Sequence, residues 1–452
     1  MASEVLPIFD RRRAGVLLHL SSLDAALGRG GRSFIDWIVS AGFSVWQVLP
    51  LGPTGTAGSP YWVRSDFAGN PAFIDTDERP SAGGDDYRAF LDASRSWLED
   101  YASFEVLSAL HGGIPWWQWP AAYRDRDKAA LERLRVEHAE ALSRLKVEQF
   151  VFAAQWQGLR GYAHARGVRF LGDVPFYVAP DSAEVWTHRA QFQLAASGLA
   201  RAVAGVPPDY FSELGQLWGN PLYDWSRMQE DGFEFWRARV RCQLARVDVL
   251  RIDHFRALAA HWAVPAGASD ARGGAWRRTP GRALLKALQN EFSVLPFVAE
   301  DLGFITADVE ALRKRFRLPG MRVLQFAFGG DSDNPHLPHM HRHNSVVYTG
   351  THDNDTTVGW FASLDHETRQ RVESYLGTNS HAMPGALIRA ACASVAALAV
   401  VPVQDLLGLG TDARLNTPGT VQGNWTWKLP PHALTHELAQ RYAVLNRLYA
   451  RA

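Results

Sequence analysis

The chain lacks several features that would narrow its class at once. Its 452 residues include two cysteines, Cys242 and Cys392, in helix-like and partly apolar surroundings, so there is no disulfide framework or zinc-ligand spacing. The 47 basic and 47 acidic residues cancel, which favours neither nucleic acid nor an anionic membrane as a partner. No apolar run approaches membrane-spanning length, and apolar residues 5–9 precede the arginines 11–13, the reverse of a signal peptide. We therefore expect a cytoplasmic protein with reduced cysteines.

Two patterns that look like ligand-binding motifs also lack the spacing that binding needs. Gly28-Arg29-Gly30-Gly31 has neither the Gly-x-Gly-x-x-Gly fingerprint nor a P-loop Lys-Ser/Thr, and it predicts a tight loop rather than a phosphate cradle. Four irregularly spaced histidines precede an apolar run and predict a polar surface loop instead of a metal site: His336, His339, His341 and His343. We predict neither a metal nor a cofactor.

Aromatic residues, in contrast, are abundant. The chain has 17 Trp, 23 Phe and 12 Tyr. Flat rings fill protein cores and also stack on the apolar faces of sugars, so the excess fits either use. The hydrophobic content of 47% and charged content of 21% are ordinary for a soluble globular protein.

Short apolar runs, many of them β-branched, recur along the chain with helix-like stretches between them. Near-continuous apolar runs are typical of strands buried on both faces, as parallel sheets require. Eight such runs with intervening helices predict a (β/α)8 barrel rather than an open sheet. The runs are Val16–Leu20, Val45–Pro50, Val168–Phe176, Val247–Asp253, Pro296–Asp301, Met321–Phe326, Ser345–Asp353 and Ala399–Leu406.

The spacing of these runs is uneven, and it predicts large insertions within a single barrel over residues 1–452. Residues 54–166, after the second strand, contain helical patterns at 85–98, 104–111 and 125–166. Residues 177–235, after the third strand, include a stretch rich in Pro, Gly and aromatic residues at 206–225. Long structured connections are usually functional, and a barrel tolerates them in the loops of its catalytic face. We expect both insertions to form walls of a site.

Three short strings, each centred on a carboxylate, follow the fourth, fifth and seventh predicted strands. They are Arg251-Ile252-Asp253-His254, Ala299-Glu300-Asp301-Leu302 and Thr351-His352-Asp353-Asn354. Charged residues at the carboxyl ends of barrel strands lie where such folds place their active sites. A retaining glycosidase needs one carboxylate as nucleophile and one carboxylic acid that protonates the leaving oxygen. The alternative is that each acid merely caps a helix or pairs with a nearby arginine.

Further segments occur in a fixed order along nearly the whole chain. They are Gln47–Thr54, Ser59–Tyr61, Phe67–Pro71, Gly172–Pro175, Pro208–Ser212, Gly215–Tyr223 and Thr349–Thr356. Together with Arg251–Arg256 and Ala299–Gly303, this set resembles the glucan-transferring branch of the α-amylase clan, the amylomaltase or 4-α-glucanotransferase family (glycoside hydrolase family 77, disproportionating enzymes). The resemblance implies transfer between maltooligosaccharides or amylose chains with retention of configuration. It leaves the oligomeric state open.

The resemblance also implies roles for the three acids. It makes Asp253 the nucleophile that forms a glucosyl ester, Glu300 the acid and then base, and Asp353 the group that stabilises the transition state. Arg251 lies two residues before Asp253, on the same strand face, and is expected to keep that acid ionised. Glu300 must start protonated, so the two acids need opposite environments.

The resemblance further implies a set of substrate-binding residues. These are Tyr61, Asp173, Tyr210, Phe211, Gln216, Trp218, Arg251, His254 and His352. Taken alone, each aromatic residue could equally be packed in the core, and Asp173 could cap a helix. The His-Asp pairs could also hold a metal, but an arginine two positions from Asp253 would repel a cation.

Three positions depart from the family pattern and bear on substrate fit. Residues 20–31 replace a Pro-rich loop that ends in Gly-Asp, residues 62–64 replace a Gln-Ser pair, and Ala257 replaces a glycine. The carboxylates alone do not separate transfer from hydrolysis, since both reactions form the same intermediate. We therefore predict a 4-α-glucanotransferase, with an α-glucan hydrolase or a catalytically silent glucan-binding protein as the alternatives.

Overall fold

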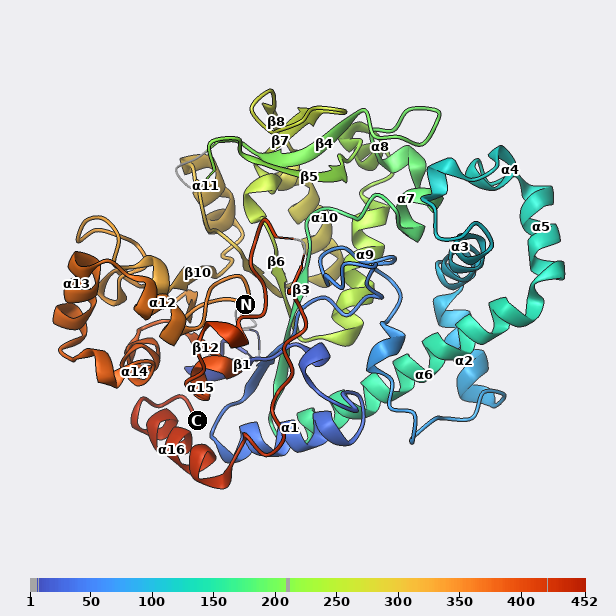
Figure 1. Cartoon of the computed structure of the whole chain (residues 1–452). Coiled ribbons are helices and arrows are strands. Elements are labelled where there is room, and N and C mark those ends of the chain that lie inside the picture. Colours follow the sequence, from blue (N-terminus) through green and yellow to red (C-terminus); the bar gives the residue numbers. More distant parts are fainter. Residues whose placement is uncertain (1–5, 7, 209–211, 421) are drawn as a thin grey trace.

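Eight parallel strands form a barrel at the centre of the molecule (Figure 1). The computed structural model describes residues 6, 8–208, 212–420 and 422–452. The sheet order is β10-β11-β12-β1-β2-β3-β6-β9, and the backbone N–H of Ala299 donates to the carbonyl of Pro319 at 2.8 Å, which brings β9 beside β10. The barrel strands are β1 (Arg13–Leu17), β2 (Val45–Gln47), β3 (Arg169–Val174), β6 (Val249–Ile252), β9 (Phe297–Ala299), β10 (Gly320–Val323), β11 (Ser345–Tyr348) and β12 (Leu398–Pro402). Each predicted run overlaps one strand, so the predicted (β/α)8 barrel is confirmed.

Alternation along these strands decides which side chains enter the barrel. On β6, Val249 packs in the barrel interior, whereas Leu250 and Ile252 pack outward against the helices. On β9, Val298 points inward in the same way. Because successive side chains alternate between faces, Arg251 and the acids that follow these strands continue the inward rows. The strand ends therefore aim their polar groups at the mouth of the barrel.

Helices cover the outside of the barrel. Helix α1 is typical: its buried residues Phe34, Ile35, Trp37 and Ile38 recur at helical spacing and face the strands. Helix α11 has acids in its first turn and cations in its last, as predicted from residues 308–316. The covering helices are α1 (Arg29–Ser40), α6 (Ala139–His164), α9 (Glu234–Arg246), α10 (Gly281–Phe292), α11 (Ala307–Arg315), α12 (Thr357–Ser363), α13 (His366–Leu376), α14 (Gly385–Ala393), α15 (Val403–Leu406) and α16 (His436–Leu448).

The segment between β2 and β3 is largely helical and extends to one side of the barrel (Figure 1). It contains α2 (Asp85–Ser94), α3 (Leu98–Leu110), α4 (Ala121–Arg124), α5 (Lys128–Glu137) and the whole of α6. The helical pattern predicted over 125–166 is two helices, because the backbone leaves the helical conformation at His138. We retain 54–166 as a proposed insertion.

A second, antiparallel sheet lies over one edge of the barrel mouth, at the top of Figure 1. Its order is β5-β4-β7-β8, from β4 (Ala202–Val206), β5 (Gln216–Pro221), β7 (Ala260–Pro265) and β8 (Ala275–Arg278). The short helices α7 (Ala183–Thr187) and α8 (Trp225–Glu230) flank it. We expected no strand in the aromatic stretch at 206–225, where β5 lies, and we did not predict β7 or β8. Every side chain of β8 is exposed, so β8 produces no apolar run.

Three local expectations can be compared with the structure. The prediction of a tight glycine loop was wrong, because Arg29–Gly31 begin helix α1. A Cβ on Gly30 would lie 1.9 Å from the carbonyl oxygen of Asp24, so close packing requires the glycine. The polar surface loop was wrong for His341, which is buried with its Nδ1 2.7 Å from Ser394 Oγ. Both cysteines are free thiols.

No helix in the described part of the chain is long and apolar enough to cross a membrane.

A fully buried arginine joins two segments that border the barrel mouth. Arg239 on α9 pairs with Asp66 at 2.9 Å and donates to the carbonyls of Pro175 and Phe176 at 2.6 and 3.1 Å. It also donates to the hydroxyl of Tyr223 at 3.2 Å. The Arg239 guanidinium therefore ties the segment around residue 66 to the loop after β3.

We expect Arg239→Met to destabilise the fold strongly. It leaves Asp66 buried without its cation, and removing one partner of a buried ion pair costs about 3–5 kcal/mol. Urea unfolding at neutral pH measures this loss. Arg241→Met on the same helix is the control, because Arg241 is half exposed and its surface pairs contribute about 0–1 kcal/mol. Equal destabilisation by the two variants would contradict the stabilising role given to the buried Arg239–Asp66 pair.

Candidate active site

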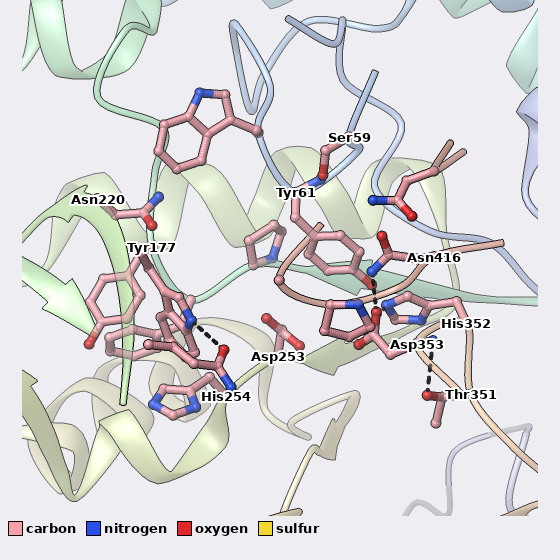
Figure 2. A pocket seen from close by; sticks show the side chains of 18 of the residues that line it. Ser59, Tyr61, Tyr177, Asn220, Asp253, His254, Thr351, His352, Asp353 and Asn416 are labelled. Carbon is pink, nitrogen blue, oxygen red and sulfur yellow. Dashed lines mark hydrogen bonds and ion pairs between the residues drawn. The ribbon is translucent and has the colours of Figure 1, made fainter. Parts of the chain in front are cut away.

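A cleft of about 640 Å³ opens at the carboxyl ends of the barrel strands. Asp253 lies near its centre in Figure 2, with Tyr177 and His254 on one side and Tyr61 and Asp353 on the other. The cleft is also lined by β5 and by residues 416–420, 424 and 425, which follow β12. Nine of the twelve predicted site residues line it: Tyr61, Gln216, Trp218, Arg251, Asp253, His254, Glu300, His352 and Asp353. Tyr210 and Phe211 lie outside the described residues.

Arg251 organises the floor of the cleft. One guanidinium nitrogen lies 2.9 Å from Asp253 Oδ1 and 2.6 Å from Asp173 Oδ2, and Nε donates to the same Asp173 oxygen at 2.8 Å. The Tyr61 hydroxyl donates to Asp173 Oδ2 at 2.6 Å. The Asp173 side chain is fully buried beneath the cleft, whereas 32% of the Asp253 side chain is exposed. Arg251 therefore holds Asp253 in place while leaving it open to a ligand.

Asp253 and Glu300 both have raised pKa values, but the charges that act on them differ. The pKa of Asp253 is raised to about 7. Burial is the largest cause, the charge of Arg251 opposes it, and the charges of Asp173 and Asp353 add to it. Burial, followed by the charge of Asp253, raises the pKa of Glu300 well above its usual range. Arg251 thus acts on Asp253 in the expected direction, but burial outweighs it, so the net shift is upward and not toward the ionised form. The second influence on each acid differs in sign: the charge of Arg251 favours the ionised form of Asp253, whereas the charge of Asp253 favours the protonated form of Glu300.

Asp353 forms the opposite wall and has partners that the sequence did not indicate. Asn416 Nδ2 donates to Asp353 Oδ1 at 2.6 Å, and His352 Nε2 lies 3.3 Å from Oδ2. Arg414 donates to the backbone carbonyl of Asp353 at 2.7 Å. The side chain remains about half exposed. Asp353 is therefore fixed from below and presents its carboxylate to the cleft.

Aromatic rings form the walls on both sides of the acids. The Tyr61 ring stacks on buried His352 with 5.0 Å between centroids, and Trp425 packs against both. Across the cleft, the Trp218 ring meets the His254 ring edge-on at 4.7 Å. Trp218 Nε1 donates to Gln216 Oε1 at 3.1 Å. Rings on opposite walls provide flat apolar surfaces beside the polar floor.

His254 combines an unusual backbone with an unpaired nitrogen. Its φ of 48° lies in the left-handed region, which bulky residues seldom adopt and which recurs at functional sites. Its buried Nε2 has no hydrogen-bond partner among the described residues. Burial, then Arg256 and His261, lowers the pKa of His254 to about 3, so the ring is neutral at neutral pH. A neutral imidazole can exchange hydrogen bonds with an uncharged ligand.

Several residues of the cleft were not predicted as site residues from the sequence, and four of them carry large or polar side chains that shape it. They are Trp62, Tyr177, Asn416 and Trp425. Residues 411–427, rich in Gly, Asn, Thr and Trp, follow the last barrel strand, and this composition is the one signal that could have indicated a ligand loop there. Trp62 belongs to the segment that departs from the family pattern.

An eight-stranded parallel barrel with three carboxylates at its mouth, one of them paired with arginine, has the arrangement that barrel enzymes use to cleave glycosidic bonds. The chain belongs to the 4-alpha-glucanotransferase family (glycoside hydrolase family 77), which it matches over residues 18–83 and 78–435. The predicted family and enzyme class are thereby confirmed.

Individual relatives agree over almost their whole length. The chain is 43% identical to the 4-alpha-glucanotransferase of Thermus thermophilus, over 95% of this chain and 97% of that one. It is 41% identical to that of Synechocystis sp., over 98% and 99%. Among solved structures it is similar to the amylomaltase from Streptococcus agalactiae in complex with acarbose, with a TM-score of 0.91 and 32% identity over 98% and 100% of the two chains.

Proposed function

We propose that the enzyme cuts an α-1,4 bond in a maltooligosaccharide or amylose and transfers the glycosyl part to the 4-hydroxyl of another glucan. The observation that supports this most directly is the pair Asp253 and Glu300 in one cleft, with Arg251 ion-paired to the first and the charge of that carboxylate raising the pKa of the second. In the proposed reaction Asp253 ionises first. Family membership supports the same activity, and the S. agalactiae relative was solved with acarbose.

In the first step, an oxygen of ionised Asp253 attacks the anomeric carbon of the donor. The bond from that carbon to the glycosidic oxygen breaks, and Glu300 gives its proton to the leaving oxygen. The products are a glycosyl ester on Asp253 and a shortened glucan with a free 4-hydroxyl. Ester formation removes the negative charge of Asp253, which lowers the pKa of Glu300 and prepares it as a base.

In the second step, ionised Glu300 accepts the proton of the acceptor's 4-hydroxyl. That oxygen attacks the anomeric carbon, and the bond to Asp253 breaks, which restores the carboxylate and the protonated Glu300. Two inversions at one carbon retain the α configuration.

Asp353 is proposed to hold ring hydroxyls as positive charge develops on the sugar. Its carboxylate faces the cleft while Asn416 and His352 fix its orientation. Preorganised groups of this kind stabilise the transition state without having to reorient during the reaction. His254 and His352 would bind hydroxyls of the same glucose unit, and Tyr61, Gln216 and Trp218 would bind the chain.

Transfer requires a sugar hydroxyl to compete with water for the same ester. Both attack through an oxygen atom, so the bound sugar gains its advantage from being held in the correct orientation. Well-oriented intramolecular groups reach effective molarities of about 10⁵ M or more. Trp218 and Gln216 on β5 form a ledge beside the acids, linked by a hydrogen bond. This ledge would seat the acceptor and favour transfer over hydrolysis.

The pH profile tests the two protonation states. Activity requires Asp253 ionised, so kcat/KM should fall as pH drops through its raised pKa of about 7, far above the ~4 of an ordinary aspartate. It should also fall at higher pH as Glu300 ionises. Initial rates of glucose release from maltotriose, with circular dichroism at each pH to confirm folding, measure the profile. An acid limb near pH 4 would contradict the raised pKa.

Replacing the nucleophile tests the chemistry. Asp253→Asn should lower kcat at least about 10³-fold, because an amide cannot form the ester, and the thermal transition should stay within a few degrees. Product analysis from maltotriose should show a ladder of longer oligomers with glucose for the unaltered enzyme. Glu310→Gln, an exposed acid on α11, is the control. Reducing ends that rise in step with cleavage would instead indicate a hydrolase.

Removing the aromatic ledge tests acceptor binding. Trp218→Ala should raise the ratio of hydrolysis to transfer several-fold, since the acceptor loses its stacking surface while water does not. Trp276→Ala, a partly exposed tryptophan outside the cleft, is the matched control. For each variant, chromatography of a maltotriose digest gives the ratio of hydrolysis to transfer. An unchanged ratio in Trp218→Ala would contradict the proposal that the ledge seats the acceptor.

A further inference from the structure

A second pocket, of about 800 Å³, lies behind the antiparallel sheet and has a strongly basic lining. Five arginines and one histidine line it: Arg189, Arg201, Arg227, Arg277, Arg278 and His261. Among the described residues, Asp224 is the one carboxylate in its lining, and it accepts the backbone N–H of Arg227 at the start of α8. In a chain whose total charge is zero, this local excess of cations is marked.

Three of these arginines have no acidic partner among the described residues. Arg189 pairs with Asp125 at 2.7 Å and Arg227 with Glu230 at 2.9 Å. Arg201, Arg277 and Arg278, in contrast, are exposed and form no ion pair or side-chain hydrogen bond with any described residue. Like charges that face one pocket repel one another unless an anion lies between them.

The position of these side chains follows from the register of the sheet. Arg277 on β8 lies directly opposite His261 on β7, so both point to the same face. The next residue, Arg278, ends the strand; its side chain starts on the other face, and it borders the pocket from the strand end. Arg201, just before β4, lies beyond the other end of β7, where its carbonyl accepts the N–H of Ala266. Along β7, five residues separate His261, opposite Arg277, from Ala266, beside Arg201, which is roughly 16 Å. The denser positive charge is therefore at the Arg277 end.

A buried and incompletely bonded histidine lies at that same end. His261 is 3% exposed, its Nδ1 lies 2.9 Å from Thr279 Oγ1, and its Nε2 has no partner among the described residues. Burial, then the charge of Arg277, lowers its pKa to about 4, so the ring is neutral. When the Thr279 hydroxyl donates to Nδ1, the hydrogen of the ring is on Nε2, which is then a donor without an acceptor. A buried donor left unpaired is costly. Nε2 is closed off from solvent, so an anion in the pocket would reach it once the side chains that cover it shift.

We propose that this pocket binds a phosphate group, free or carried by a sugar, between Arg277, Arg278 and His261. Guanidinium groups bind phosphate oxygens by charge-assisted hydrogen bonds, which are among the strongest in proteins. Trp225 lines the same pocket and supplies a ring on which an attached sugar could stack.

The pocket also adjoins the catalytic cleft. The Trp225 ring packs on Tyr223 at 5.0 Å and on Phe176 at 6.1 Å, and Phe176 lines the cleft. His261 in addition contributes to the lowered pKa of His254, which lies in the cleft. An anion bound here would therefore lie against the back of the substrate wall.

Isothermal titration calorimetry of the full chain at low salt tests the proposal. Inorganic phosphate and glucose 6-phosphate are the two probes, and glucose is the neutral control for binding in the catalytic cleft. We expect a dissociation constant of about 1 mM or tighter for at least one phosphate probe. Equal affinities would show that the phosphate alone is recognised, and tighter binding of glucose 6-phosphate would add the sugar. Affinity should fall as sodium chloride rises.

Variants locate the site. Arg277→Ala and Arg278→Ala should each weaken binding about tenfold or more, since each removes a charge-assisted contact. Arg282→Ala, which removes an exposed arginine outside the pocket, should leave binding unchanged. The readout is independent of glucan transfer, so it stands whether or not the proposed reaction is correct. The proposal is overturned if neither phosphate probe binds up to about 10 mM, or if Arg277→Ala, Arg278→Ala and the control bind alike.

Discussion

The contact between Arg251 and its two aspartates is the constraint on which the rest of the site depends. Asp173 is fully buried and holds Nε and one terminal nitrogen of the guanidinium, and that same terminal nitrogen positions Asp253 at the cleft floor. Tyr61 completes the group by bonding to Asp173 and Arg251. A buried cation shared between a hidden and a partly exposed carboxylate fixes the latter and opposes the rise in its pKa that burial causes, which is what an attacking group requires.

The fold supplies this constraint through strand periodicity. Residues 249, 251 and 253 form one inward row of β6, and residues 298 and 300 form the next row on β9. Neighbouring barrel strands thus bring two acids to one cleft, while longer connections carry the aromatic walls. The walls depend in turn on buried contacts outside the barrel, such as those of Arg239 with the loop after β3. Rigid strands position the reacting groups, and the inserted segments decide what reaches them.

The barrel and its three acids could be predicted from the sequence because both leave local signals. Buried parallel strands produce apolar runs, and each acid directly follows one. The partners of Asp353 could not be predicted, since Asn416 comes from a segment 63 residues away that reaches the cleft only through folding. Exposed β8 has no apolar pattern, and β7 was missed with it. The net pKa of Asp253 was also missed: the arginine is visible in the sequence, but the depth of burial is not.

Trapping the glycosyl ester tests the central claim most directly. In Glu300→Gln, a glycosyl fluoride donor should still react, because fluoride leaves without a proton, while the missing base slows removal of the ester. Peptide mass spectrometry after denaturation should then show the sugar mass on the peptide that carries Asp253. A sugar attached to any other residue, or no adduct while fluoride is released, would contradict the account.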